Sequence, residues 1–331
     1  MIVETDFKSL LAKGEKNGGT KLTDHISHVI IAAEKIAGSI GLDKELARKG
    51  AVLHDIGKIH PAFQDKLLVD KFDPIDYRSE IPLRHEISSI LFLHAFAKTD
   101  WPLLIEMVIA HHKSIKTINS DRNQRGILDL INEYGDIEIF KRHSESWQDW
   151  NGLAKDFLHY FGYTTNEINI DNAQKAFDFT VHYCEQVNLG WSKYRGLLMA
   201  SDHFASAMVF DTEKFISKSF KTPELDFFFN KNRQSSLYPL SKLQNEDKRQ
   251  HTIVLAPTGA GKTDFLIKRC RNRIFYILPF QASINAMYKR LVEACPNDDV
   301  RVLHSASRLI VDCEKRVEEE KLLQSLSGSA I

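Results

Sequence analysis

The stretch Leu53-His54-Asp55-Ile56-Gly57-Lys58 constrains this chain more than any other. It places an adjacent histidine and aspartate directly after the apolar run 50–53, where the pattern predicts the end of a buried helix. Burying both side chains costs free energy unless each has a partner. A divalent metal satisfies both, because imidazole supplies one ligand and the carboxylate a second, or bridges two ions. A simple hydrogen bond between the two side chains is the alternative, and the short motif alone does not separate these cases.

Composition describes an ordinary globular chain without a strong electrostatic bias. It has 331 residues, enough for two domains, with 43% hydrophobic and 27% charged residues and a formal net charge of zero. Any nucleic-acid path must therefore come from local basic patches. The four cysteines form no Cys-x-x-Cys pair, so neither a disulfide framework nor a cysteine zinc site is expected, which suits a reducing cytosol. The N-terminus lacks a secretory signal pattern, and no apolar run is long enough to span a membrane.

The first part of the chain carries helical periodicity and no alternating strand pattern. Residues 1–21 are predicted to be a partly ordered lead-in, and 65–81 an irregular excursion. We therefore predict an all-α domain over residues 1–210. The predicted helices start near Leu22 and then cover residues 43–58, 83–97, 102–112, 145–160, 171–188 and 192–210.

The character of the sequence changes after residue 210. Residues 211–250 are polar, with an aromatic cluster at Phe227-Phe228-Phe229, and are predicted to be a linker. Two short apolar runs, 252–256 and 274–278, flank a glycine-rich turn and a helical pattern. This order is typical of a βαβ unit in a parallel sheet. We therefore predict that residues 251–331 are the incomplete N-terminal part of a RecA-like α/β domain.

Further histidines and aspartates lie near helix ends or within apolar helices of the first domain. Taken singly, each is more often a satisfied core residue or a cap than a ligand. Together they supply enough ligands for two ions. The set comprises His25, His54, Asp55, His85, His111, His112 and Asp202.

The motifs resemble those of the HD superfamily of metal-dependent phosphohydrolases. More narrowly, they resemble the HD nuclease domain of the CRISPR-associated nuclease–helicase of type I interference systems. The order and approximate spacing match over about residues 20–210. The matching pieces are Leu22-Thr23-Asp24-His25, His54-Asp55-Ile56-Gly57-Lys58, Phe63-Gln64, Arg84-His85-Glu86 with Ser88, His111-His112, and Ser201-Asp202 with Ala205-Ser206.

This resemblance implies two metal positions bridged by Asp55. His25, His54 and Asp202 would complete one position, and His85, His111 and His112 the other. His28 competes with His25 but fits the spacing less well, and His203 receives no role. Asp55 and Lys58 are the expected catalytic residues, with Lys58 offsetting charge on a phosphate. An imidazole-rich shell favours Mn²⁺, Fe²⁺, Ni²⁺ or Co²⁺ over Mg²⁺, which prefers oxygen ligands.

The glycine-rich turn Ala256-Pro257-Thr258-Gly259-Ala260-Gly261-Lys262-Thr263 resembles motif I of superfamily-two helicases. The backbone N–H groups of such a loop cradle the phosphates of ATP, with Lys262 on the terminal phosphates and Thr263 on Mg²⁺. Leu278-Pro279-Phe280 with Asn285 and Arg290 resembles the next helicase motif. Tyr238-Pro239-Leu240 with Gln244 is a candidate adenine-reading element. The ATP-binding residues are therefore expected to be Thr258, Gly259, Ala260, Gly261, Lys262 and Thr263.

The acidic strand end and arginine finger of a complete motor have no clear counterpart. The candidate Leu309-Ile310-Val311-Asp312-Cys313-Glu314 follows Lys262 too soon and has no adjacent acids, and Glu318-Glu319-Glu320 has the pattern of a solvated helix face. We therefore expect a truncated chain without ATPase or helicase activity of its own.

Three functions remain open at this point. The first is a cytoplasmic endonuclease or exonuclease that degrades single-stranded DNA, the strand displaced by a guide-RNA surveillance complex, in CRISPR antiviral defence. Lys113, Lys116, Arg122 and Arg125 could then line a DNA groove or simply form a solvated loop. The second is an HD phosphohydrolase acting on nucleotides, and the third a non-cutting module that binds the surveillance complex.

Overall fold

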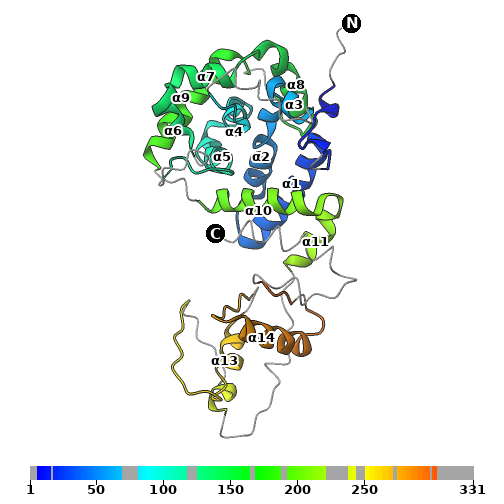
Figure 1. Ribbon diagram of the computed structural model, residues 1–331, viewed down its shortest axis with the longest axis vertical. Helices are drawn as coiled ribbons and strands as arrows, with labels where there is room; N and C mark the ends of the chain where they lie inside the picture. The colour runs from blue at the N-terminus through cyan, green and yellow to red at the C-terminus, as the bar shows by residue number, and fades with distance from the viewer. Residues whose placement is uncertain are drawn as a thin grey trace. The chain divides into compact units, whose positions relative to one another are not determined.

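A computed structural model of the chain describes residues 6–15, 18–68, 81–117, 125–164, 168–187, 192–220, 238–243, 250–270, 274–298 and 300–303 (Figure 1). It divides into two compact units, one extending to Ile216 and the other running from Ser217 to Glu320. The domain boundaries expected from the sequence, at 210/211 and 250/251, stay predictions. None of the described helices has the length and hydrophobicity that a membrane crossing requires.

The first unit is built from helices, which confirms the all-α prediction for its described residues. Apart from one isolated antiparallel bridge between Leu11 and Lys21, these residues form no strand. Short 3₁₀ segments join the helices: η1 (Phe7–Ser9), η3 (Ile56–Ile59), η5 (Leu93–Ala95), η6 (Lys98–Asp100) and η8 (Val209–Asp211). The α-helices are α1 (Leu22–Ile40), α2 (Lys44–Leu53), α3 (Pro61–Leu68), α4 (His85–Ile90), α5 (Trp101–Val108), α6 (Ile127–Tyr134), α7 (Asp136–His143), α8 (Trp147–Tyr160), α9 (Ile170–Gln186), α10 (Lys193–Met208) and α11 (Thr212–Ser219).

Four helices form a connected packing arrangement in this unit (Figure 1): α2 and α10 contact each other, and each of them also packs against α1 and α5. The apolar stripe of α1, including Ile26, Val29 and Ala33, is fully buried there, as its helical spacing predicts. Asp43 caps α2 by accepting hydrogen bonds from the N–H groups of Glu45 and Leu46. This packing brings the start of α1, the end of α2 and the middle of α10 together.

The helix predicted over residues 43–58 is shorter in the structure, since α2 ends at Leu53. His54 and Asp55 form a turn, and η3 follows. The reason lies in α4: the Gly57 N–H donates to Ser89 Oγ at 2.8 Å, and Ser89 Oγ donates to the His54 carbonyl at 2.8 Å. These bonds take up backbone groups that a continued helix would pair internally.

Two more helices are also shorter than predicted. The pattern over 83–97 forms α4, a turn and η5, and the pattern over 102–112 forms α5, which ends at Val108. The His111 imidazole accounts for the second ending, because its Nδ1 donates to the Val108 carbonyl at 2.5 Å. By contrast α8, α9 and α10 begin and end within two residues of their predicted bounds. The sequence interpretation missed α3, α6, α7 and α11, each only eight residues long.

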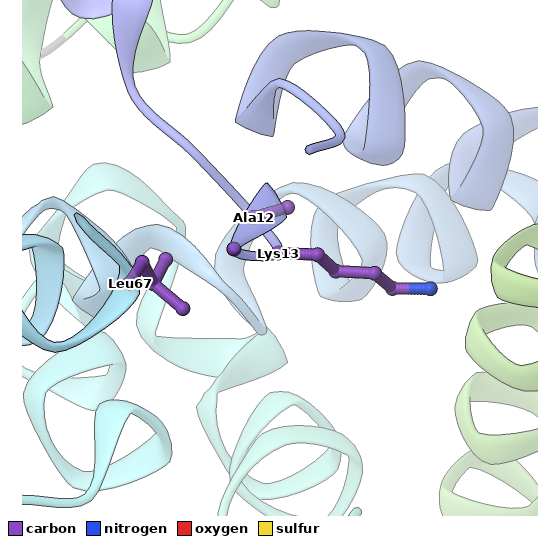
Figure 2. A pocket seen from close by; sticks show the side chains of 4 residues that line it. Ala12, Lys13 and Leu67 are labelled. Atoms are coloured by element: carbon purple, nitrogen blue, oxygen red, sulfur yellow. The ribbon is translucent and has the colours of Figure 1, made fainter. Parts of the chain in front are cut away.

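The described residues before α1, 6–15 and 18–21, pack against the rest of the first unit. Leu10 and Ala12 are buried, and Lys13 extends from this segment toward α10 (Figure 2). Gln64 on α3 holds the segment in place, since its side-chain amide donates to the Leu11 carbonyl and accepts from the Leu11 N–H, both at 3.0 Å. The segment is therefore packed against the helices of the first unit.

The second unit contains η9 (Pro239–Lys242), α13 (Lys262–Arg269) and α14 (Gln281–Ala294) among its described residues. Residues 252–256 and 274–278, where strands are predicted, form no strand, and no sheet is present among the described residues. Their apolar side chains are accordingly exposed, with Ile253 96% and Ile277 89% accessible. The described residues of this unit therefore contain helices but no sheet, and the RecA-like fold stays a prediction.

Candidate metal centre

His54 and Asp55 occupy the turn that ends α2, and both are almost completely buried. His25, on the first turn of α1, places its Nε2 3.2 Å from Asp55 Oδ2. The same Nε2 lies 3.2 Å from Oδ1 of Asp202, in the middle of α10. His54 Nε2 lies 3.4 Å from Asp55 Oδ2. Three helices thus supply one cluster of His25, His54, Asp55 and Asp202.

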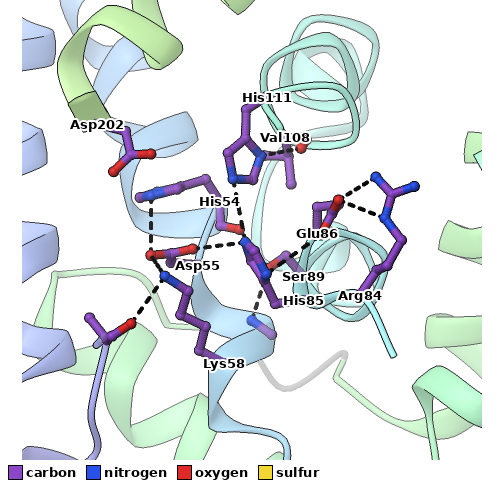
Figure 3. A network of polar contacts seen from close by, with 12 residues as sticks. His54, Asp55, Lys58, Arg84, His85, Glu86, Ser89, Val108, His111 and Asp202 are labelled. Atoms are coloured by element: carbon purple, nitrogen blue, oxygen red, sulfur yellow. Dashed lines mark hydrogen bonds and ion pairs between the residues drawn. The ribbon is translucent and has the colours of Figure 1, made fainter. Parts of the chain in front are cut away.

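A second cluster adjoins the other oxygen of Asp55. His85, the first residue of α4, places its Nε2 3.1 Å from Asp55 Oδ1 and 3.4 Å from His111 Nε2 (Figure 3). The His112 ring lies 5.0 Å from that of His85, centroid to centroid. Asp55 therefore directs one carboxylate oxygen toward each cluster, as a bridging ligand would.

The described residues contain two groups of three side chains whose candidate ligand atoms all lie within 4.8 Å of one another. They are His25 with His54 and Asp55, and His85 with His111 and His112. Asp202 falls outside both groups and contacts the first through His25. The seven residues singled out in the sequence thus lie together, while their role as ligands stays a prediction.

Backbone carbonyls fix the tautomers of two of these histidines. His54 Nδ1 lies 2.7 Å from the Ala51 carbonyl, and His111 Nδ1 lies 2.5 Å from the Val108 carbonyl. A carbonyl oxygen can only accept, so both Nδ1 atoms carry a proton, and in the neutral ring each Nε2 has its lone pair directed to the cluster. Such a contact is what orients a metal-binding imidazole.

Electrostatics hold the two aspartates charged and part of the histidine set neutral. Burial alone would raise the pKa of Asp55, but His54, Lys58 and a hydrogen bond from His25 outweigh it and hold that pKa well below its ordinary value. Burial, followed by the neighbouring histidines, holds the pKa of His111 well below its usual range, and burial lowers that of His112 to about 4. These imidazoles are therefore unprotonated, as metal ligands must be.

His25 behaves differently. Burial lowers its pKa, but hydrogen bonds to Asp202 and Asp55 raise it above the ordinary histidine value. A proton on His25 thus sits between two carboxylates, where positive charge is favoured. Binding of a cation by the same side chains would displace that proton.

The donor set fits divalent transition metals. His54 Nε2 is buried without a hydrogen-bond partner among the described residues. The Asp55 oxygens form ion pairs with Lys58 and the neighbouring histidines but no hydrogen bond of good geometry, and a bound cation would satisfy all three atoms. The 3.4 Å between His85 Nε2 and His111 Nε2 matches two nitrogens bound to one ion at about 2.1 Å. Five imidazoles and two carboxylates are a softer set than Mg²⁺ prefers.

Lys58 reaches this centre as the sequence predicts. Its Nζ lies 2.7 Å from Asp55 Oδ2 and donates to the Ala12 carbonyl at 3.4 Å. Gln64 supports it, since Gln64 Nε2 donates to the Lys58 carbonyl at 2.6 Å. From the sequence, Gln64 was recognised only as part of the Phe63-Gln64 motif. Its contacts explain why an amide side chain is needed at this position.

The surroundings of His85 also hold residues to which sequence reasoning gave no role. Arg84 forms an ion pair with Glu86, which holds the pKa of Glu86 far below its usual range against the effect of burial. Buried His143 accepts from the Arg84 N–H at 3.1 Å and donates from Nδ1 to the Ile139 carbonyl. Burial lowers the pKa of His143 to about 3, so this ring stays neutral and holds the start of α4 in place.

Other sequence candidates lie apart from the centre. His28 packs edge-on against Phe210, and His203 belongs to neither group of candidate ligands. Arg125, one of the basic residues that could line a DNA groove or form a solvated loop, forms an ion pair with Glu133. Arg122 lies outside the described residues, as do Phe227-Phe228-Phe229, Gln244, 309–314 and 318–320.

In the second unit, the glycine-rich turn directly precedes α13, which begins at Lys262. Gly259 and Gly261 have φ angles of 85° and 88°, which favour glycine. The Lys262 ammonium donates to the carbonyls of Ala256 and Pro257 at 2.7 and 2.8 Å. Thr263 Oγ1 lies 3.2 Å from the Tyr276 hydroxyl.

The η9 segment packs against this turn. The Leu240 N–H donates to the Ala260 carbonyl at 3.0 Å, and Ser241 Oγ donates to Asp264 Oδ2 at 2.9 Å. A Cβ on Gly261 would lie 2.2 Å from Ser241 Oγ, so glycine is required there. The predicted adenine-reading element thus lies beside the predicted phosphate loop.

In a comparison with known proteins, residues 22–147 match the HD domain family. This range includes six of the seven clustered residues, all but Asp202. HD domains bind divalent metals, in agreement with the histidine and aspartate groups found here. The chain is 23% identical over 324 residues to the CRISPR-associated nuclease/helicase Cas3 of Methanothermobacter thermautotrophicus; the match covers 85% of this chain and 38% of that protein.

The chain is also similar to T. fusca Cas3, whose crystal structure matches it with 19% sequence identity and a TM-score of 0.45. The match covers 91% of this chain and 40% of that one, so the chain spans about two fifths of the length of these relatives. Residues 22–147 thus match the HD domain, and over most of its length the chain is similar to Cas3 proteins.

Proposed function

We propose that the first unit is a metal-dependent nuclease that hydrolyses phosphodiester bonds of single-stranded DNA. The observation that carries the proposal is the pair of three-residue groups joined at Asp55, whose two oxygens face different groups. Two bound cations would polarise a phosphodiester, lower the pKa of a bound water and stabilise the leaving oxygen. Among the ions that suit this donor set, we propose Mn²⁺, Fe²⁺, Ni²⁺ or Co²⁺.

In this proposal, seven residues of the chain hold the two ions, and Lys58 compensates charge on the substrate. His25, His54, Asp55 and Asp202 would hold one ion, and His85, His111, His112 and Asp55 the other. Lys58, a partly buried cation 2.7 Å from Asp55, lies where it can offset charge on a substrate phosphate. The Ala51 and Val108 carbonyls keep His54 and His111 in the tautomer that this role needs.

The biological setting is proposed from the names of the relatives. A Cas3-like chain would act on the strand displaced by a guide-RNA surveillance complex of a type I CRISPR system, in antiviral defence. Single-stranded DNA and that complex are the partners we propose.

A substrate panel tests this proposal. The purified chain, reconstituted with Mn²⁺ or Co²⁺, is incubated with circular single-stranded DNA, linear single strands, duplex DNA and a set of nucleotides. We expect cleavage of single strands, with loss of the circular form if the enzyme cuts internally. Hydrolysis of nucleotides without DNA cleavage would favour an HD phosphohydrolase instead, and binding to the surveillance complex without cleavage would favour a non-cutting module.

We also propose that the turn formed by residues 258–263 binds the phosphates of ATP with Mg²⁺. Its support is the left-handed Gly259 and Gly261 directly before α13, with η9 packed beside them. Lys262→Ala is expected to weaken ATP binding at least tenfold, because a charged contact to the terminal phosphates is lost. Calorimetric titration measures it, with exposed Lys289→Ala on α14 as the control; equal affinity in both variants would contradict the assignment.

A further inference from the structure

The segment formed by Leu10–Gly14 is fastened to the metal centre at two points. The Lys58 ammonium, which forms an ion pair with Asp55, donates a hydrogen bond to the Ala12 carbonyl. The Gln64 side-chain amide forms hydrogen bonds with the backbone N–H and carbonyl of Leu11. Gly14 lies so close to α3 that a Cβ would come 2.7 Å from the Leu67 carbonyl oxygen. The backbone of this segment is therefore fixed, and so is the direction in which Lys13 leaves it.

Lys13 extends from this segment to α10 (Figure 2). Its Nζ donates to the Ser206 carbonyl at 3.3 Å, and Ser206 Oγ in turn donates to Asp202 Oδ1 at 3.3 Å. The ammonium lies within electrostatic range of Asp202, Lys58 and Asp55. It is thus a second lysine at the border of the metal centre, on a segment that the sequence interpretation treated as a lead-in.

The environment of this ammonium is incomplete for a cation. The side chain is half-buried, yet no described carboxylate lies within 4.0 Å of Nζ, and its hydrogen-bond partner is one neutral carbonyl. Partly desolvating a lysine in this way costs free energy unless an anion compensates. An ammonium has three N–H donors, so two remain for a ligand. An open depression of about 410 Å³, lined by Ala12, Lys13, Gly14 and Leu67, lies beside the backbone of this segment, and the Lys13 side chain extends from the segment in the direction away from Leu67 (Figure 2).

We infer that Lys13 binds a backbone phosphate of the single strand next to the phosphodiester held at the metal centre. The inference rests on the nuclease function proposed above and adds a substrate contact to it. Lys58 and Lys13 then act on different phosphates, one at the reacting bond and one beside it. Lys13 is a binding residue here and takes no part in holding the ions.

Its salt dependence provides the test. For single strands, each phosphate contact contributes about 0.7 to the slope of log affinity against log salt concentration. We use Lys13→Gln, which removes the charge and keeps a polar side chain that is one bond shorter. With the metal-loaded chain and a short single strand, we expect KM to rise about tenfold at low salt and its salt slope to fall by about 0.7. The value of kcat and the bound metal should stay close to wild type.

Two companion variants separate charge from structure. Lys13→Arg keeps the charge and should restore KM and most of the salt slope. Lys21 is an exposed lysine that pairs with Leu11 in the isolated β-bridge, and Lys21→Gln should behave as wild type. If Lys13→Gln lowers thermal stability but leaves KM and the slope unchanged, Lys13 only anchors the segment and the inference is wrong. If wild type itself cleaves no single-stranded DNA, the proposed function fails and the inference with it.

Discussion

Replacing Asp55 with alanine is expected to abolish metal-dependent DNA cleavage, lowering the rate by about a thousandfold or more. Asp55 directs one oxygen toward each group of ligands, so its loss removes a ligand from both at once. The helical fold should persist, because α1, α2, α5 and α10 pack through apolar faces that the substitution leaves unchanged. Single-turnover cleavage of a labelled single strand measures the effect, with circular dichroism as the check on folding.

Asp65→Ala on α3 is the matched control, since this carboxylate is exposed and belongs to neither group of candidate ligands. It should cleave at the wild-type rate. Undiminished cleavage by a clean Asp55→Ala preparation would reject the site.

Gly57→Ala is expected to destabilise the first unit by about 3 kcal/mol or more. A Cβ at this position would lie 2.0 Å from the His85 carbonyl oxygen and 2.7 Å from the Ser89 backbone nitrogen. Both contacts are with the backbone of α4, which cannot move without carrying His85 away from Asp55. Urea unfolding measures the stability, and metal affinity should fall with it.

Gly152→Ala on α8 provides the opposite case. A Cβ there meets nothing within 4 Å, so the substitution should stabilise the protein by about 0.5–1 kcal/mol through better helix propensity. Equal stability of the two variants would show that the contact between Gly57 and α4 does not constrain the centre.

The central helices and the clustered residues could be predicted because their signals are local. The buried stripe of α1 has helical spacing, and each histidine motif stands at a helix end that the apolar pattern marks. The ends of α2 and α5 could not be placed, since they depend on Ser89 from α4 and on the His111 ring itself. Those are tertiary contacts, which no local pattern contains.

The supporting residues escaped prediction for the same reason. Lys13 follows no periodic pattern, and its position becomes meaningful only when Gln64, 53 residues beyond Leu11, fixes the segment beside Asp202. His143 lies 59 residues from the backbone amide that it accepts from. The two predicted strands do not form in the described residues. Their apolar runs fit a sheet locally, but a strand also needs neighbouring strands with which to pair.

Metal stoichiometry tests the central claim most directly. The purified chain is stripped, reloaded with Co²⁺ or Mn²⁺, desalted and analysed by elemental mass spectrometry, alongside His111→Ala. The clusters that share Asp55 predict two ions per wild-type chain and about one in His111→Ala, which loses a ligand of only the second group. A wild-type chain that binds no transition metal, or a His111→Ala chain that still holds two ions with unchanged affinity, would contradict the two-ion centre.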